Sequence, residues 1–345
     1  MSIIEEFSKN VGKDWEELRK AENLTSEHIQ TIKSQFADIP ISSSDTSLVV
    51  FGSIARNECT SGSDIDWTLL VDGQTNPNQL NLSHIIQEKL EITELAQPGQ
   101  TGMFGQMTFS HDLIHYIGGQ DDTNHNLSRR ILLLLESQSI LDSSENGNAR
   151  DRVISGVIGK YIHNDSGYAA TSDKENVPRF LLNDIIRFWR TMCVDFAYKQ
   201  IEQQGIKWAL RNIKLRMSRR LIFVKGLLMC ARMHNTKLNQ NEIASSLRAF
   251  SSIKPLDFLV ETCLDYGIDQ NIIITILDSY DNYLKMLNDK TARDHLKSLD
   301  MYAAYGDPIF EEARQNSHAF QGALNEIFLK DNNAISKFTI KYGVF

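Results

Sequence analysis

The chain has 345 residues, of which 41% are hydrophobic and 23% charged, and its formal net charge is −8. This length exceeds one ordinary domain, and the composition is that of a globular protein without long disordered tracts. The acidic total argues against a protein that coats nucleic acid non-specifically. No stretch approaches the roughly 20 apolar residues that span a bilayer, and the charged N-terminus lacks a signal-peptide core, so we expect a cytoplasmic protein without membrane contact.

The first part of the chain alternates between helical and strand-like patterns. Apolar residues recur at helical spacing over 12–37, and Pro40 ends that pattern. Ser47–Phe51 and Ile65–Val71 are short apolar runs that predict buried strands. Residues 80–95 return to helical spacing.

Later segments become progressively more helical. Met107–Ile117 is apolar but ambiguous between helix and strand, whereas the length of Leu127–Ile140 favours a buried helix. The polar segment 142–152 predicts a domain boundary. Beyond it the pattern is helical at 179–204, 207–234, 239–250, 255–266, 270–288 and 307–330.

These patterns together predict an α+β fold, with a small mixed β-sheet core, flanking helices and a mostly α-helical C-terminal domain. The predicted boundaries are an N-terminal helical segment at 1–45, a core domain at 46–142 and a helical domain at 150–345. The four cysteines form no CxxC pair, so we expect reduced thiols and neither zinc nor disulfides. Three histidines also lack metal-ligand spacing and are interpreted as ordinary polar residues: His111, His115 and His125.

Two aspartates stand at the start of the second predicted strand. Residues two apart on a strand point to the same face, so Asp64 and Asp66 project their carboxylates together. Neighbouring carboxylates at neutral pH are typical of a site for hard divalent cations. Mg²⁺ bound through one or two carboxylates and substrate phosphates is the expected form.

Gly52 and Ser53 follow the first predicted strand and precede a predicted helix. A glycine allows the backbone to approach a phosphate closely, and the serine hydroxyl and helix amides can donate hydrogen bonds to it. Arg56 can add a charged contact to the same phosphates. We therefore predict a phosphate cradle here, with Ser63, just before the aspartate pair, as a further nucleotide contact.

Gly-Ser followed after a short interval by Asp-hydrophobic-Asp resembles the signature of the polymerase-β-like nucleotidyltransferase superfamily. The fuller pattern, Gly-Ser-x-Ala-Arg at 52–56 and Ser-Asp-x-Asp at 63–66, is most similar to stand-alone bacterial transferases and to the adenylyl- and uridylyltransferases of nitrogen regulation. In many relatives a glycine follows the arginine. This chain has Asn57 there, which affects the turn and not the metal site.

The resemblance implies transfer of a nucleoside monophosphate from a nucleoside triphosphate to an acceptor hydroxyl by a two-metal mechanism, with Mg²⁺ or Mn²⁺ as cofactor. It also implies a third carboxylate from a later strand, which completes the metal site and helps to deprotonate the acceptor. Asp112 is our choice because it lies in an apolar run after glycine-rich turns. Glu136 is the second candidate, with Asp121 and Asp122 behind it.

Positive charge is concentrated in one helical region. Residues 179–232 carry twelve Lys or Arg and three acids, a concentration that suits an anionic ligand. Arg187 and Arg216 lie on predicted helical faces and are expected to contact the nucleotide or an acceptor. For each arginine the alternative is an ordinary solvated cation.

The resemblance leaves the acceptor open among a protein side chain, a tRNA end, a small molecule and a second nucleotide, with a slight preference for a regulatory protein. The competing hypothesis is a non-catalytic nucleotide-binding sensor or toxin–antitoxin-type module that keeps the same fold. The third carboxylate distinguishes the two hypotheses, because without it nucleotide binding survives while catalysis is lost.

Overall fold

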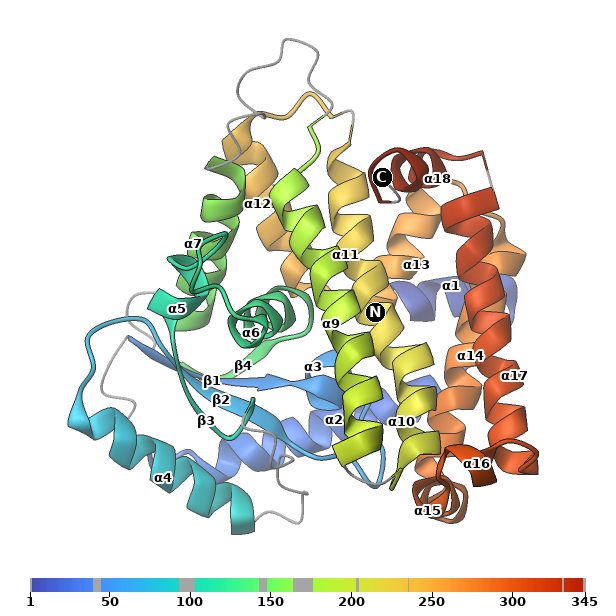
Figure 1. Cartoon of the computed structure of the whole chain (residues 1–345), viewed down its shortest axis with the longest axis horizontal. Helices are drawn as coiled ribbons and strands as arrows, with labels where there is room; N and C mark the ends of the chain where they lie inside the picture. The colour runs from blue at the N-terminus through green and yellow to red at the C-terminus, as the bar shows by residue number, and fades with distance from the viewer. Residues whose placement is uncertain are drawn as a thin grey trace. The chain divides into compact units, whose positions relative to one another are not determined.

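The computed structural model describes residues 2–39, 45–92, 103–142, 148–163, 176–202, 205–234, 236–330 and 332–343 (Figure 1). They belong to two compact units, and each is described by itself. The helical unit comprises residues 1–21, 175–236 and 255–345, and the sheet unit comprises 22–174 and 237–254. Each unit therefore combines segments that are distant in sequence. Whether the expected ranges 1–45, 46–142 and 150–345 are separate domains stays a prediction.

The sheet unit contains a mixed sheet with the strand order β3-β2-β1-β4. β1 pairs antiparallel with β2 and with β4, and β2 pairs parallel with β3. The strands are β1 (Thr46–Phe51), β2 (Asp66–Val71), β3 (Gln106–Phe109) and β4 (Gln138–Asp142). This small mixed sheet, followed by a helical C-terminal part, confirms the predicted α+β fold class.

One face of the sheet packs on helices α2 (Glu16–Gln35) and α4 (Pro77–Ile92). Alternate strand residues point to this face because the side-chain period of a strand is two. The strand residues in this apolar core include Leu48, Val50, Trp67, Leu69 and Met107. The helices contribute apolar residues at helical spacing, among them Ile32 from α2 and Ile86 and Leu90 from α4, and Phe36 follows directly after α2.

The opposite face is covered by α5 (Ser110–Ile114), α6 (Asn124–Leu135) and α7 (Ala149–His163), and α12 (Gln240–Ser252) packs against α7 (Figure 1). A glycine permits the close approach of α5 and α7, since a Cβ atom on Gly156 would lie 2.7 Å from Cδ1 of Ile114. Both sheet faces are therefore covered by helices, which explains why β1 is buried along its whole length.

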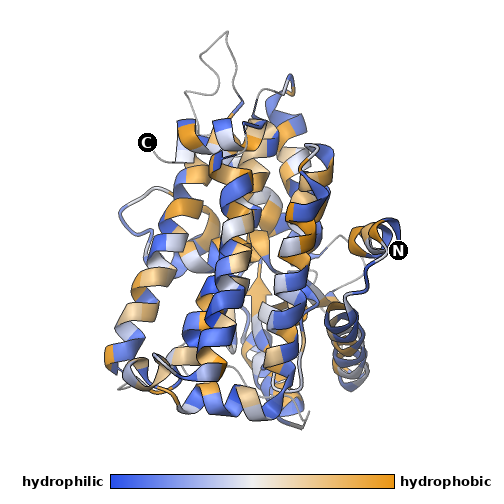
Figure 2. Cartoon of the chain, turned by 90° about the vertical axis from the view of Figure 1, so that its right-hand side faces the viewer, coloured by the Kyte–Doolittle hydropathy of each residue, from blue (hydrophilic) through white to orange (hydrophobic). Residues whose placement is uncertain are grey.

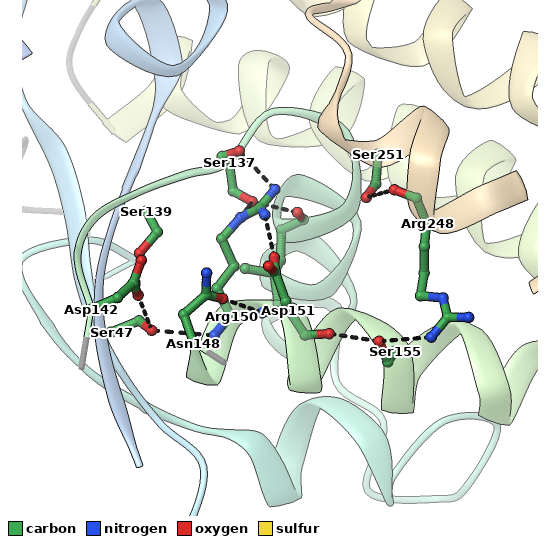
Figure 3. Close-up of polar contacts among 11 residues, drawn as sticks. Ser47, Ser137, Ser139, Asp142, Asn148, Arg150, Asp151, Ser155, Arg248 and Ser251 are labelled. Carbon is green, nitrogen blue, oxygen red and sulfur yellow. Dashed lines mark hydrogen bonds and ion pairs between the residues drawn. The ribbon is translucent and has the colours of Figure 1, made fainter. Parts of the chain in front are cut away.

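Arg150, at the start of α7, links that helix to the sheet edge (Figure 3). Its Nε donates to Oγ of Ser137 over 2.8 Å, and its backbone N–H donates to Oγ of Ser47 over 3.3 Å. The Ser47 hydroxyl in turn donates to Oδ1 of Asp142 over 2.6 Å. This network joins β1, β4 and α7. Arg150 is buried, although it belongs to the polar segment 142–152 that predicts a domain boundary.

One element prediction is wrong, and another differs in where the helix begins. Leu127–Ile140 is not one helix, because α6 ends at Leu135 and the chain re-enters the sheet as β4. The helix expected at 12–37 is present as α2, which begins at Glu16, because Gly12 terminates the separate helix α1 (Ile3–Val11) in the left-handed conformation with φ 66°. The ambiguous segment Met107–Ile117 contains both types, since β3 runs directly into α5.

The helical unit confirms the predicted helical C-terminal part. Its largest helices show hydrophilic and hydrophobic residues mixed along their lengths, as expected for helices with one buried side (Figure 2). Among the residues that the structure describes, no helix is both long and apolar enough to cross a membrane. Its helical segments, π-helical ones marked η, are α1, α9 (Arg179–Glu202), α10 (Trp208–Lys214), η1 (Leu215–Arg219), α11 (Arg220–Met233), α13 (Pro255–Asp265), α14 (Gln270–Asn288), α15 (Lys290–Ser298), α16 (Met301–Ala304), α17 (Pro308–Asn325), η2 (Glu326–Lys330), α18 (Ala334–Phe338) and η3 (Thr339–Gly343).

Candidate active site

The two motif aspartates lie just before and at the start of β2, a strand that packs one face on the α2–α4 core. Ile65 and Trp67 are 2% and 1% exposed and belong to that core. Asp66, the first residue of β2, lies between them and therefore faces the other way, and Asp64 lies two residues before the strand. Asp64 is exposed and Asp66 is half-buried, so solvent reaches this position.

Gly52 lies beside Asp66 because the residue before it, Phe51, is the register partner of Asp66 in the β1–β2 pair. The glycine has φ 69°, and a Cβ atom at this position would lie 3.0 Å from Oδ2 of Asp66. Both the left-handed backbone and this close approach favour glycine. The backbone of Gly52 and the carboxylate of Asp66 therefore lie next to each other.

The short helix α3 (Gly52–Arg56) ends at Asn57, which adopts the left-handed conformation with φ 62°. The backbone N–H groups of Asn57 and Glu58 both donate to the carbonyl of Ser53, the second over 2.8 Å. Asparagine tolerates this conformation better than most residues, so the departure from the family's glycine is compatible with the turn.

Two sets of hydrogen bonds hold the loop between α3 and β2. The backbone N–H of Cys59 donates to the buried Oγ1 of Thr25 over 3.1 Å. The backbone N–H of Thr60 donates to Oγ of Ser63 over 2.9 Å, and that of Ser63 donates to the carbonyl of Thr60 over 3.0 Å. The Ser63 side chain therefore stabilises the turn that precedes Asp64. Its predicted contact with the nucleotide stays a prediction.

Arg56 is 10% exposed and lies between two buried carboxylates. Its Nε donates to Glu58 over 2.8 Å, and its Nη1 forms an ion pair with Glu136. These contacts tie α3 to the residue that ends α6. The predicted role of Arg56 at the phosphates is thus accompanied by a structural one, and Glu136, the second candidate for the third carboxylate, is bound to this arginine.

Lys254 is a site-supporting residue that the sequence patterns do not indicate. Its Nζ donates to the carbonyl of Ala55 and to Oε1 of Gln138, each over 2.8 Å. A cation at the C-terminal end of a helix satisfies a carbonyl that has no partner within the helix. Lys254 is 199 positions from Ala55, and no local pattern reveals a contact of that separation.

A small pocket lies on the Asp66 side of the sheet. Its wall includes Phe51 and Thr68, together with Thr108 from β3 and Arg129 from α6. The hydroxyls of the two threonines are 2.8 Å apart, and Nη2 of Arg129 donates to the carbonyl of Met103 over 3.2 Å. Burial lowers the pKa of Arg129, and the negative charge of Asp112 opposes this shift. The pocket therefore has an apolar wall with a cation at its edge.

The candidates for a third carboxylate occupy different environments. Asp112 lies in the first turn of α5, 3.7 Å from Nδ1 of His111, and its side chain is 47% exposed. Asp122 is buried and forms an ion pair of 2.9 Å with Arg130, whereas Asp121 is exposed. In the described parts of the chain, no three His, Cys, Asp or Glu side chains lie together as metal ligands. In this conformation Asp112 does not form such a group with Asp64 and Asp66.

The two predicted arginine contacts belong to the helical unit, whereas Gly52 and the aspartate pair belong to the sheet unit. Arg187 lies on α9 and Arg216 in η1. The Nε of Arg216 donates to Oδ1 of Asn212 over 2.7 Å. Their proposed contact with the nucleotide stays a prediction.

Residues 29–96 match the family described as the nucleotidyltransferase domain. This segment contains β1, α3, the loop and β2, and with them Gly52, Ser53, Asp64 and Asp66. No curated protein matches the chain. The geometry of the Gly-Ser turn beside the aspartate pair agrees with the family match. Residues 29–96 therefore match a nucleotidyltransferase domain, a domain family that belongs to the polymerase-β-like superfamily.

Proposed function

We propose that the sheet unit transfers a nucleoside monophosphate from a nucleoside triphosphate to an acceptor hydroxyl. The observation that carries the proposal is the meeting of the Gly52 backbone with the Asp66 carboxylate, in a segment that matches the nucleotidyltransferase family. A side chain at position 52 would fill the space beside the carboxylate. Glycine leaves that space to a phosphate group.

The donor set at this point fits a hard divalent cation such as Mg²⁺ or Mn²⁺. Asp64 and Asp66 would hold it, with phosphate oxygens of the nucleotide as further ligands. When bound, the cation supplies charge neutralisation at the phosphates and lowers the pKa of the acceptor hydroxyl. The hydroxyl of Ser53 would donate to the phosphate that enters beside Gly52.

In the transfer, the acceptor oxygen forms a bond to the α-phosphorus, and the bond from that phosphorus to the bridging oxygen of pyrophosphate breaks in line. The hydroxyl proton must leave the acceptor, and Asp112 stays our predicted group for this step. Its support is its position directly after β3, the strand paired with β2. The acceptor itself is proposed to be a protein, a tRNA or a nucleotide, with a protein preferred.

The test uses each of the four α-labelled nucleoside triphosphates with Mg²⁺, with and without cell extract, and follows where the label goes. The Asp64→Asn/Asp66→Asn variant removes the proposed cation ligands. The Asp38→Asn/Glu88→Gln variant is the matched control, since it removes two exposed carboxylates of the same unit. We expect label on an acceptor with the wild type and the control, and none with the first variant.

Two results contradict the proposal. Transfer at the wild-type rate by Asp64→Asn/Asp66→Asn would show that another site is responsible. Nucleotide binding that depends on Mg²⁺ and on the two aspartates, without transfer to any acceptor, would instead support the non-catalytic nucleotide-binding module.

A further inference from the structure

Two half-buried arginines of the helical unit lie four residues apart where η1 passes into α11, so they share one side of the helix. The Nε of Arg216 donates to Oδ1 of Asn212 over 2.7 Å. The Nη1 of Arg220 donates to Oε1 of Gln321 over 3.1 Å. Both acceptors are neutral amides, so each guanidinium is oriented by a hydrogen bond without being neutralised.

Helix α17 adds a third titratable group to these arginines. η1 contacts α17, and Gln321, the partner of Arg220, lies one turn after His318 on that helix. Burial lowers the pKa of His318, and Arg216, Arg314 and Arg220 lower it further. Burial and Arg216 likewise lower the pKa of Arg220. The contact of η1 with α17 and the bond from Arg220 to Gln321 therefore bring the three groups together, where their positive charges oppose one another.

The acids near this cluster have other partners. Glu311 raises the pKa of His318, but its Oε2 is bound by Nη2 of Arg314 over 2.6 Å. The Cys193 thiol raises the pKa of Arg220 less than burial and Arg216 lower it. Burial raises the pKa of that thiol. In the described ranges of the chain, no carboxylate forms an ion pair with Arg216 or Arg220. The cluster therefore keeps a net positive charge.

We propose that Arg216, Arg220 and His318 form a binding site for a phosphate group. Each guanidinium has five N–H donors and uses one in the amide contact, so a planar pair of donors remains for the oxygens of a phosphate. Orientation of both arginines before binding reduces the entropy cost of binding. A π-helical turn, such as η1 here, is often found at functional sites.

The phosphate can come from a free nucleotide or from the backbone of an RNA. Both sources present the same chemistry to the cluster, and the test distinguishes them. The proposal extends the prediction made for Arg216 and does not rest on nucleotidyl transfer by the sheet unit.

The test measures binding by calorimetry in EDTA, which removes divalent cations and with them the proposed binding at Asp64 and Asp66. The probes are pyrophosphate, ATP and a single-stranded RNA oligonucleotide. The test variant is Arg216→Gln/Arg220→Gln. The matched control is Lys285→Gln/Lys337→Gln, which removes two positive charges from exposed positions of the same unit. Circular dichroism checks that all variants are folded.

We expect wild type and control to bind at least one probe, and Arg216→Gln/Arg220→Gln to bind it at least tenfold more weakly. Binding of pyrophosphate or ATP identifies a small phosphate ligand. Binding of RNA alone, weakening steeply with salt, identifies a nucleic acid backbone. The proposal is overturned if the wild type binds no probe, or if the two double variants bind equally. Neither result affects the transfer assay with Asp64→Asn/Asp66→Asn.

Discussion

Gly52 approaches Asp66 so closely that a Cβ atom on the glycine would lie 3.0 Å from Oδ2 of the aspartate. Phe51, the last residue of β1, pairs with Asp66, the first residue of β2, and Gly52 follows Phe51 directly. This close approach makes position 52 a sensitive probe of the proposed site, because one methyl group would occupy the space between backbone and carboxylate.

Gly52→Ala is expected to reduce nucleotidyl transfer at least tenfold and to lower the free energy of unfolding by about 1–2 kcal/mol, the cost of a left-handed alanine. Gly12→Ala is the matched control. Gly12 has φ 66°, close to the 69° of Gly52, but its Cβ would meet nothing within 4 Å. The control should lose similar stability and keep full activity. Equal activity of both variants would show that the space beside Asp66 is not used.

Glu136→Ala is expected to lower the free energy of unfolding by about 3 kcal/mol, because it leaves the buried Arg56 guanidinium with Glu58 as its remaining carboxylate partner. Urea denaturation measures this loss. Asp14→Ala serves as the control, since that acid forms an exposed ion pair with Arg19 and should change stability by about 1 kcal/mol or less. Similar losses in the two variants would contradict a structural role for the buried pair.

Asp112→Asn tests the predicted third carboxylate. If Asp112 accepts the proton, transfer falls to background, while the free energy of unfolding changes by less than about 0.5 kcal/mol because the side chain is half-exposed. Single-turnover assays with labelled triphosphate measure the transfer, and Asp38→Asn, an exposed acid of the same unit, is the control. Wild-type transfer by Asp112→Asn removes this residue from the mechanism.

Lys254→Met is expected to lower the free energy of unfolding by about 2 kcal/mol, because it removes two charge-assisted hydrogen bonds, to Ala55 and to Gln138. Denaturant titration gives the magnitude. Lys237→Met, at an exposed position of the same unit, should change stability by less than about 0.5 kcal/mol. A small effect at Lys254 would mean that the end of α3 is held by its other contacts.

The His318 ring is expected to titrate below the ordinary pKa of 6.5, because burial and the three neighbouring arginines disfavour its charged form. Proton binding then favours the unfolded chain, so this group's contribution to stability falls as the pH drops below 6.5 towards the folded pKa. NMR titration measures this pKa. Pyrophosphate should raise it, and so should Arg216→Gln/Arg220→Gln in the absence of any anion. If the pKa of His318 responds to neither change, His318 does not belong to one cluster with Arg216 and Arg220.

Local sequence patterns predicted the local structure around β2, whereas the roles of Asp64 and Asp66 stay a prediction. Strand alternation predicted that Asp66 points away from Ile65 and Trp67, and the burial of these two residues agrees. The Gly-Ser turn is also local, because the conformation of Gly52 depends on its own missing Cβ. Such features depend on a few neighbouring residues, and the sequence shows them directly.

Contacts between distant residues were not predictable in this way. Residues 138–140 follow directly on an apolar helical run, yet they form the first part of β4, because β1 provides a pairing partner for them. Lys254 reaches α3, and Glu136 reaches Arg56, across long sequence separations. Propensity and periodicity contain no information about such partners.

The sequence by itself determined the α+β class, the turn at Gly52 and the two buried strands on either side of the motif, because the period of a strand and the freedom of glycine are local properties. Only the tertiary structure decided that Arg56 is held by Glu58 and Glu136, and that Arg216, Arg220 and His318 form one cationic cluster. The reason is that charge pairing and burial depend on distances in space between residues that are far apart in the chain.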